Sequence, residues 1–93
     1  MGLGLMLVLV ICRPVSDADQ ASFGQLLTAE LAALRDLKAG GSLTDAWSPG
    51  QPGAVLMLEA PGVPEAARLA ASLPLAAAGL ISTEIIPLHP LEL

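Results

Sequence analysis

Aromatic and basic side chains are scarce in this 93-residue chain. It has no tyrosine, one tryptophan and one phenylalanine, and its four Lys and Arg residues face nine Asp and Glu residues. Nucleic-acid-binding proteins cluster Lys and Arg against the phosphates and stack aromatic rings on the bases. The net charge of −5 and the shortage of rings therefore argue against a nucleic-acid partner.

Cysteine and histidine occur once each, as Cys12 and His89. A single cysteine excludes an internal disulfide, and these two residues do not supply the ligands of a typical zinc site. The sequence also lacks a glycine-rich phosphate loop and a Ser-His-acid set. We therefore expect no metal ion and no cofactor. We read Cys12 as a buried strand residue, and a lone thiol favours the cytoplasm.

The longest uncharged apolar run, residues 1–12, ends at Arg13. A membrane-spanning helix needs roughly 20 apolar residues, so this run is too short. A signal peptide is the closer alternative, but no Lys or Arg precedes the run and no small-residue cleavage site follows it. Its Leu, Val and Ile content is typical of a buried strand. Because the MLVLVI segment starts at Met6, we interpret residues 1–5 as an upstream extension.

Hydrophobic residues are abundant, at 54% of the chain, whereas charged residues make up only 14%. An average domain is nearer ~25% charged. The length fits a single domain spanning residues 1–93, and a domain this small buries a limited core by itself. The excess of apolar surface predicts contact with a second copy of the chain and hence a homo-oligomer.

Hydrophobic periodicity and turn signals predict the order β, α, β, β, α, β. We expect Ser16 or Asp17 to cap the first helix, and Pro-Gly clusters to separate the later elements. Two right-handed crossovers around a hairpin give a ferredoxin-like α+β fold, with a four-stranded antiparallel sheet and both helices on one face. The predicted strands are 5–12, 42–48, 54–59 and 80–87, and the predicted helices are 18–39 and 64–72.

The predicted sheet leaves one face uncovered, and alternating Leu, Val, Ile and Met side chains occupy it. An apolar face of this size is not stable in water. We expect two copies to pack these faces together as a dimeric α+β barrel.

Glu30 is the most informative residue of the sequence. It follows Leu26 by four positions and precedes Leu34 by four, so it lies on or beside the core-facing stripe of the first helix. A buried carboxylate is costly unless it is paired or protonated, and in a desolvated site it can act as a general base. Alternatively, Glu30 extends to solvent or pairs with Arg35 or Arg68.

Three other residues are candidates for a binding site. Leu43, Asp45 and Trp47 alternate along one predicted strand, so we expect them to share a face where Asp45 and Trp47 line a small-molecule pocket. The alternative for Asp45 is an outward charge on an edge strand. His89 lies in a proline-flanked tail and is either exposed or part of the site.

Several segments together resemble muconolactone isomerase, over nearly the whole of residues 6–90. They are the MLVLVI start, the helix carrying Glu30, the GSLTDAW segment at 41–47, SLPL at 72–75 and IPLHP at 86–90. The resemblance implies a ferredoxin-like unit that forms dimeric α+β barrels and assembles further into a decamer. It also implies a cofactor-free reaction that moves a double bond in a butenolide by proton transfer. Glu30 matches the family's suspected proton-transfer residue, and Trp47 matches a tryptophan near its pocket.

The chain departs from that family where cations bind the substrate carboxylate. Leu27 replaces a usual lysine, Thr44 and Asp45 replace a basic or aromatic pair, and Ile11 replaces an arginine. A less charged substrate than muconolactone is therefore expected. Related barrels include polyketide cyclases and monooxygenases, which suggests secondary metabolism.

We expect a cofactor-independent isomerase or cyclase acting on a small lactone or polyketide-like metabolite. In the alternative, the barrel is a non-catalytic small-molecule-binding or assembly protein. A third possibility, a membrane-associated or secreted chain, requires residues 1–12 to lie outside the sheet. The first hypothesis predicts that Glu30 lies within a pocket that is closed by sheet-to-sheet pairing of two copies.

Overall fold

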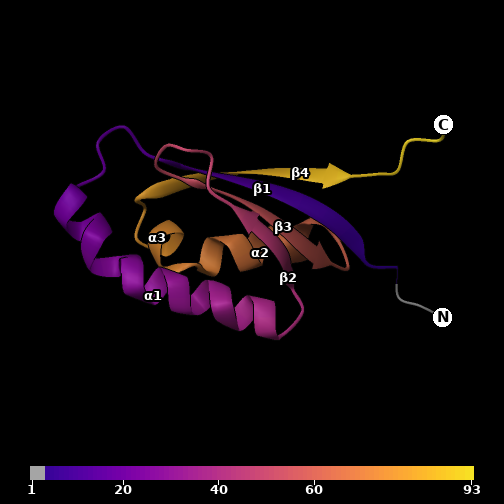
Figure 1. Cartoon of the computed structure of the whole chain (residues 1–93), viewed down its shortest axis with the longest axis horizontal. Helices are drawn as coiled ribbons and strands as arrows, with labels where there is room; N and C mark the ends of the chain where they lie inside the picture. Colours follow the sequence, from indigo (N-terminus) through magenta and orange to yellow (C-terminus); the bar gives the residue numbers. More distant parts are fainter. Residues whose placement is uncertain (1–3) are drawn as a thin grey trace.

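The computed structural model describes residues 4–93, and its elements follow the predicted order with one addition (Figure 1). Residues 1–3 of the expected extension lie outside the described residues, while Gly4 and Leu5 precede the first strand without regular structure. The elements are β1 (Met6–Pro14), α1 (Gln20–Ala39), β2 (Leu43–Trp47), β3 (Ala54–Ala60), α2 (Val63–Ser72), α3 (Pro74–Ala77) and β4 (Ile81–Leu88).

The four strands form one sheet in the order β2-β3-β1-β4, and every neighbouring pair is antiparallel. The helices lie on one side of this sheet, and no described helix lies on the other (Figure 1). This arrangement is the ferredoxin-like α+β fold, so the predicted fold class is confirmed. The apolar segment beginning at Met6 is β1, one of the two inner strands of the sheet, and no helix within residues 4–93 is long and apolar enough to cross a membrane.

The core lies between the sheet and the helices, because alternate strand residues point toward α2 and α3. Val8 and Val10 of β1 and Leu56 and Leu58 of β3 are almost completely buried there. Small residues on α2 allow that helix to approach the sheet closely. Core side chains from the helices and from the start of β4 are Ala66, Ala70, Leu73, Leu75 and Ile81.

Most element boundaries lie within two residues of the sequence-based prediction, and two of the differences have a clear physical cause. The cap of α1 is Asp19 rather than Ser16 or Asp17, since its carboxylate accepts hydrogen bonds from the Ser22 hydroxyl at 2.7 Å and the Ser22 N–H at 3.3 Å. Strand β1 pairs with β3 only as far as Cys12, and it continues to Pro14 by pairing with β4 alone. A residue that pairs on one side only can be a proline, because its missing N–H is tolerated there.

A β-bulge in β2 corrects the expectation that Leu43, Asp45 and Trp47 share one face. Leu43 pairs with Leu58, whereas Asp45 pairs with Met57, the next residue back along β3. Paired residues of antiparallel strands lie on the same face, and successive residues alternate. Leu43 therefore faces the helices, while Asp45 and Trp47 lie on the opposite side of the sheet.

That opposite side, which we call the open face, is apolar at its centre as predicted. Its polar residues lie toward the edges, where Arg13 and Glu84 form an exposed ion pair at 2.9 Å. The hydrophobic side chains that the strand register places on the open face are Leu7, Leu9, Ile11, Trp47, Val55, Met57, Ile86 and Leu88.

Candidate functional site

Helix α1 approaches the sheet only along β2, and its other packing partner in the described chain is α3. Leu26, Ala33 and Leu37 on its inner side are partly buried against the core. The one fully buried residue of this helix is Glu30, with 6% of its surface exposed. The prediction that Glu30 lies on the core-facing stripe is therefore confirmed, and the solvent-exposed alternative is wrong.

The first turn of α3 holds the Glu30 carboxylate. The backbone N–H of Leu75 donates a hydrogen bond to Glu30 Oε1 at 2.9 Å. Amides in the first turn of a helix lack an acceptor within the helix, and they favour a negative charge. A hydrogen bond to a charged group contributes roughly 1.5–3 kcal/mol. The contact joins α1 to α3 and fixes the direction in which the carboxylate points.

The second carboxylate oxygen of Glu30 has no hydrogen-bond partner within residues 4–93. In that part of the chain, no completely buried side-chain nitrogen or oxygen lacks a partner. Oε2 must therefore keep some accessible surface.

Glu30 lines a cavity of about 280 Å³, which we call the inner cavity. Its polar contributors besides Glu30 are Cys12, Ser48 and Gln51, and none of its lining residues is Lys, Arg or His. The remaining lining residues are Phe23, Leu27, Leu31, Leu34, Pro52, Gly53, Ala54, Leu75 and Ile81. Such a site disfavours an anionic molecule, because no cation in the lining offsets the charge of Glu30.

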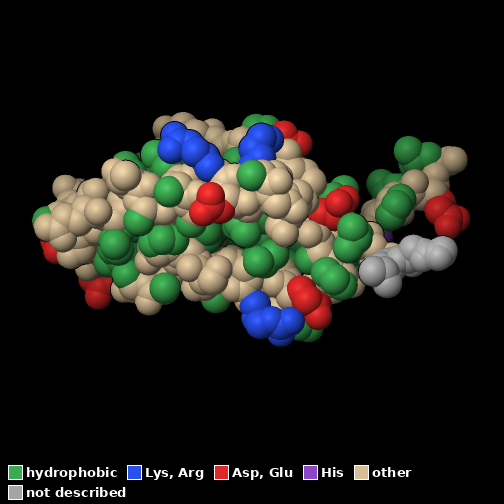
Figure 2. Space-filling model, turned by 90° about the horizontal axis from the view of Figure 1, so that it is seen from below, with side chains coloured by type: hydrophobic (Ala, Val, Ile, Leu, Met, Phe, Trp, Pro, Cys, Tyr) green, Lys and Arg blue, Asp and Glu red, His purple; other side chains and the backbone are tan. Residues whose placement is uncertain are grey.

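The inner cavity lies on the helix side of the sheet, between α1 and the ends of β1 and β3. Leu27 and Leu31 on α1 border it and are each 44% exposed. Viewed from below the helices, hydrophobic side chains form a band across the middle of this side (Figure 2). The expectation of a pocket closed by sheet-to-sheet pairing is therefore corrected, since such pairing covers the opposite face.

Cys12 faces the inner cavity from β1, and its chemistry is tied to Glu30. Burial, and then the negative charge of Glu30, raise the pKa of the Cys12 thiol from 9.0 to about 11. The thiol is therefore protonated at neutral pH, and a protonated thiol is a poor nucleophile. Cys12 contributes a small, weakly polar wall and no thiolate.

Alkylation of Cys12 tests this arrangement. Because the thiolate is the reactive form, we expect slow reaction with iodoacetamide at pH 8, with a rate that increases up to about pH 11. In Glu30→Gln the pKa of Cys12 falls, since one of the two causes of its elevation is removed, and alkylation at pH 8–9 becomes faster. The urea-unfolded protein provides the reference rate. Equal rates in the folded and unfolded proteins would contradict the buried placement of Cys12.

The other predicted site residues do not lie with Glu30. Trp47, which is 49% exposed, and Asp45 belong to the open face and line none of the cavities described here. His89 follows β4 and lines a separate hollow with residues of the start of β1. Cys12, which lines the inner cavity, lies near the other end of β1. At the usual rise of a strand, His89 is therefore ~20 Å from the inner cavity.

Of the residues that line the inner cavity, only Glu30 was a predicted site residue, and three of the others show what signal the sequence carries. Cys12 alternates with Val8 and Val10, which is a signal that it faces the helices. Gln51 belongs to a segment that the sequence identified only as a turn. The Leu75 N–H had no detectable signal, because it is a backbone donor, and the Leu-Pro-Leu segment at 73–75 predicts only the end of the preceding helix.

The fold and this site define a ferredoxin-like α+β protein with one buried carboxylate in an apolar cavity between its first helix and its sheet. No protein-family model matches the chain, and no curated protein matches its sequence significantly. Among solved structures, it is similar to 5-chloro-2-hydroxyhydroquinone dehydrochlorinase (TftG) from Burkholderia phenoliruptrix AC1100, in complex with 2,5-dihydroxybenzoquinone. The TM-score is 0.67 and the identity 24%, over 86% of this chain and 90% of that chain. This likeness shows the fold.

Proposed function

We propose that this protein is a cofactor-independent enzyme, similar to muconolactone isomerase, that moves a proton on a small lactone or polyketide-like metabolite. Glu30 is its acid–base residue. The observation that carries the proposal is a buried carboxylate that lines an apolar cavity and has one oxygen anchored by Leu75 N–H.

The chemistry needs only one group that takes up and returns a proton. With a β,γ-unsaturated butenolide, Glu30 Oε2 removes the proton from C3, and the electron pair delocalises over the ring as a dienolate. The same carboxyl group returns the proton to C5, which leaves the double bond conjugated with the carbonyl. An acid–base residue placed in this way typically contributes 10²–10⁴-fold to the rate, as an order of magnitude.

The lining of the inner cavity supports an uncharged substrate. Among residues 4–93, Glu30 is the only charged residue that lines it, and no Lys or Arg contributes to it. A substrate carboxylate would be repelled by Glu30 and would have no partner of opposite charge. The similar structure of a dehydrochlorinase that binds a dihydroxybenzoquinone supports action on a small ring compound.

A homodimer formed through the open faces is part of the proposal. Leu9, Met57 and Ile86 lie side by side at the centre of this face, and the described chain places no helix over them. Pairing two such faces removes them from water and forms the dimeric barrel. Asp45 and Trp47 would then lie at the interface between the two copies, and the dimers would be the units of a further assembly such as a decamer.

Turnover of a neutral butenolide tests the proposed function. We expect the protein, after treatment with EDTA and dialysis, to convert 5-methylfuran-2(3H)-one to its conjugated isomer, followed by ultraviolet absorbance. Added Mg²⁺ or Zn²⁺ should not change the rate. Binding of the lactone without turnover would favour the alternative of a non-catalytic binding protein.

A further inference from the structure

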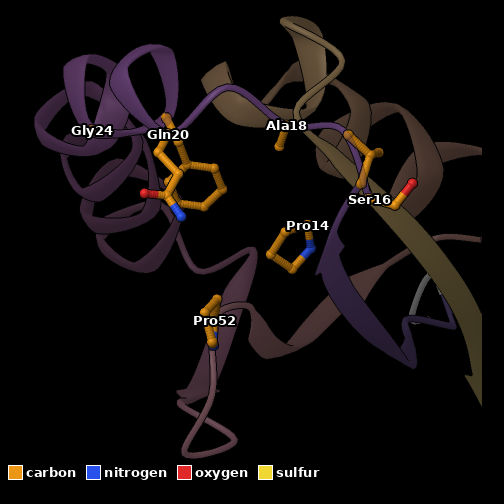
Figure 3. A pocket seen from close by; sticks show the side chains of 8 residues that line it. Pro14, Ser16, Ala18, Gln20, Gly24 and Pro52 are labelled. Carbon is orange, nitrogen blue, oxygen red and sulfur yellow. The ribbon is translucent and has the colours of Figure 1, made fainter.

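A second cavity lies next to the inner cavity, and we call it the outer cavity. It occupies about 450 Å³ between the end of β1, the first turns of α1 and the loop that joins β2 to β3. Figure 3 shows Pro14 and Pro52 on opposite sides of this space, with Gln20 above them on the helix. Its lining residues include Pro14, Ser16, Gln20, Phe23, Gly24 and Pro52.

The two cavities share two walls, Phe23 of α1 and Pro52 of the β2–β3 loop. Each of these residues contacts the inner cavity that contains Glu30 and also the outer cavity. A molecule that extends past Phe23 and Pro52 therefore occupies both spaces. The inner cavity alone, at about 280 Å³, is below the roughly 300–1,000 Å³ of typical ligand sites.

The chemical character of the outer cavity matches that of the inner one. No charged residue lines it, and its polar side chains are the neutral Ser16 and Gln20. The rings of Pro14, Phe23 and Pro52 supply flat apolar surface, and the Gln20 amide can both donate and accept hydrogen bonds. An uncharged ring with a hydroxyl or carbonyl group suits these walls.

We propose that the outer cavity binds the distal part of the substrate, so that the natural substrate is an uncharged molecule of at least two rings. Its reacting ring lies against Glu30 in the inner cavity, and its second ring lies between Phe23, Pro14 and Pro52. Phe23 is the residue that selects for this shape. The proposal rests on the proposed function and specifies the substrate class of that site.

Gly24 provides a variant that fills the outer cavity and preserves the fold. It lies in the outer wall on α1, and a Cβ atom added at Gly24 meets no atom within 4 Å. Leucine is also a better helix former than glycine, so Gly24→Leu should leave α1 intact. Ala32→Leu is the matched control, because Ala32 is exposed on the same helix and lines neither cavity. Gln20→Phe is a second variant that fills the outer cavity, because Gln20 also lines it.

The experiment compares two neutral butenolides that differ only in their distal group. The affinities of 5-methylfuran-2(5H)-one and 5-phenylfuran-2(5H)-one are measured by calorimetry, and turnover is measured with the corresponding 2(3H) isomers. We expect the phenyl compound to bind the wild type at least about tenfold more tightly. Gly24→Leu and Gln20→Phe should remove this preference without weakening the methyl compound, whereas Ala32→Leu should retain it.

An unchanged preference in both filled variants, or no preference in the wild type, would overturn the proposal. Calorimetry separates this failure from a failure of the proposed function, because it needs no turnover. Binding that depends on the outer cavity without isomerisation would reject the catalytic role of Glu30 and keep the two-cavity site. Isomerisation that is insensitive to the filled variants would keep the catalytic role of Glu30 and reject the two-cavity site.

Discussion

Replacing Glu30 with glutamine should reduce butenolide isomerisation by roughly 10²–10⁴-fold. Glutamine has nearly the same shape as glutamate, and its amide oxygen can still accept the hydrogen bond from Leu75 N–H that is 2.9 Å long in the native chain. The amide does not take up a proton at neutral pH. The loss should therefore appear in kcat, measured by ultraviolet absorbance, with little change in the thermal unfolding midpoint.

Two further variants make that result interpretable. Glu65→Gln is the matched control, because Glu65 lies on α2, pairs with Arg68 and lines neither the inner nor the outer cavity. It should retain the wild-type rate. Glu30→Leu removes the acceptor of the Leu75 amide and should destabilise the fold by about 1–3 kcal/mol, since a buried N–H loses its partner. Full activity in Glu30→Gln would remove Glu30 from the mechanism.

Leu9→Asp should convert the protein from a dimer to a monomer. Leu9 lies at the centre of the open face, opposite Met57 on β3 and Ile86 on β4. In the proposed dimer, the substitution places two uncompensated carboxylates in a desolvated interface, at a cost of several kcal/mol for each. The dissociation constant measured by analytical ultracentrifugation should therefore rise by at least about 10³-fold.

The control for the dimer prediction introduces the same charge on the helix side. Ala71 is exposed on α2, so Ala71→Asp should leave the dimer unchanged. Because the inner cavity belongs to the helix side of one chain, the Leu9→Asp monomer should still bind 5-phenylfuran-2(5H)-one. A wild-type protein that sediments as a monomer, or a Leu9→Asp dimer, would contradict pairing through the open faces.

Local patterns were sufficient to predict the fold, because each element carries its own signal. The Leu, Val and Ile run of β1, the spacing of apolar residues along α1 and the Pro-Gly clusters between later elements are all determined within a few residues. The burial of Glu30 followed from the same spacing. The sequence could therefore identify the residue that lies within the core-facing stripe.

Tertiary geometry explains what the sequence did not predict. One extra residue in β2 places Leu43 and Trp47 on opposite faces of the sheet. The alternation of residues in the sequence does not reveal such a bulge. The anchor of Glu30 is a backbone N–H 45 positions away, which no side-chain motif encodes. The position of α1 is also non-local, because α1 approaches the sheet only along β2 and packs on α3, and no local pattern encodes this offset.

The stereochemistry of proton return tests the role of Glu30 most directly. Isomerisation of 5-methylfuran-2(3H)-one in D₂O creates a stereocentre at C5, which can be followed by deuterium NMR and chiral chromatography. If Glu30 returns the proton from one side of the ring, the wild type should give one C5 enantiomer in excess, with protium at C5 wherever the carboxyl proton is returned before it exchanges with D₂O, and Glu30→Gln should give only the slow racemic background. A single enantiomer formed by Glu30→Gln at the wild-type rate would contradict the account.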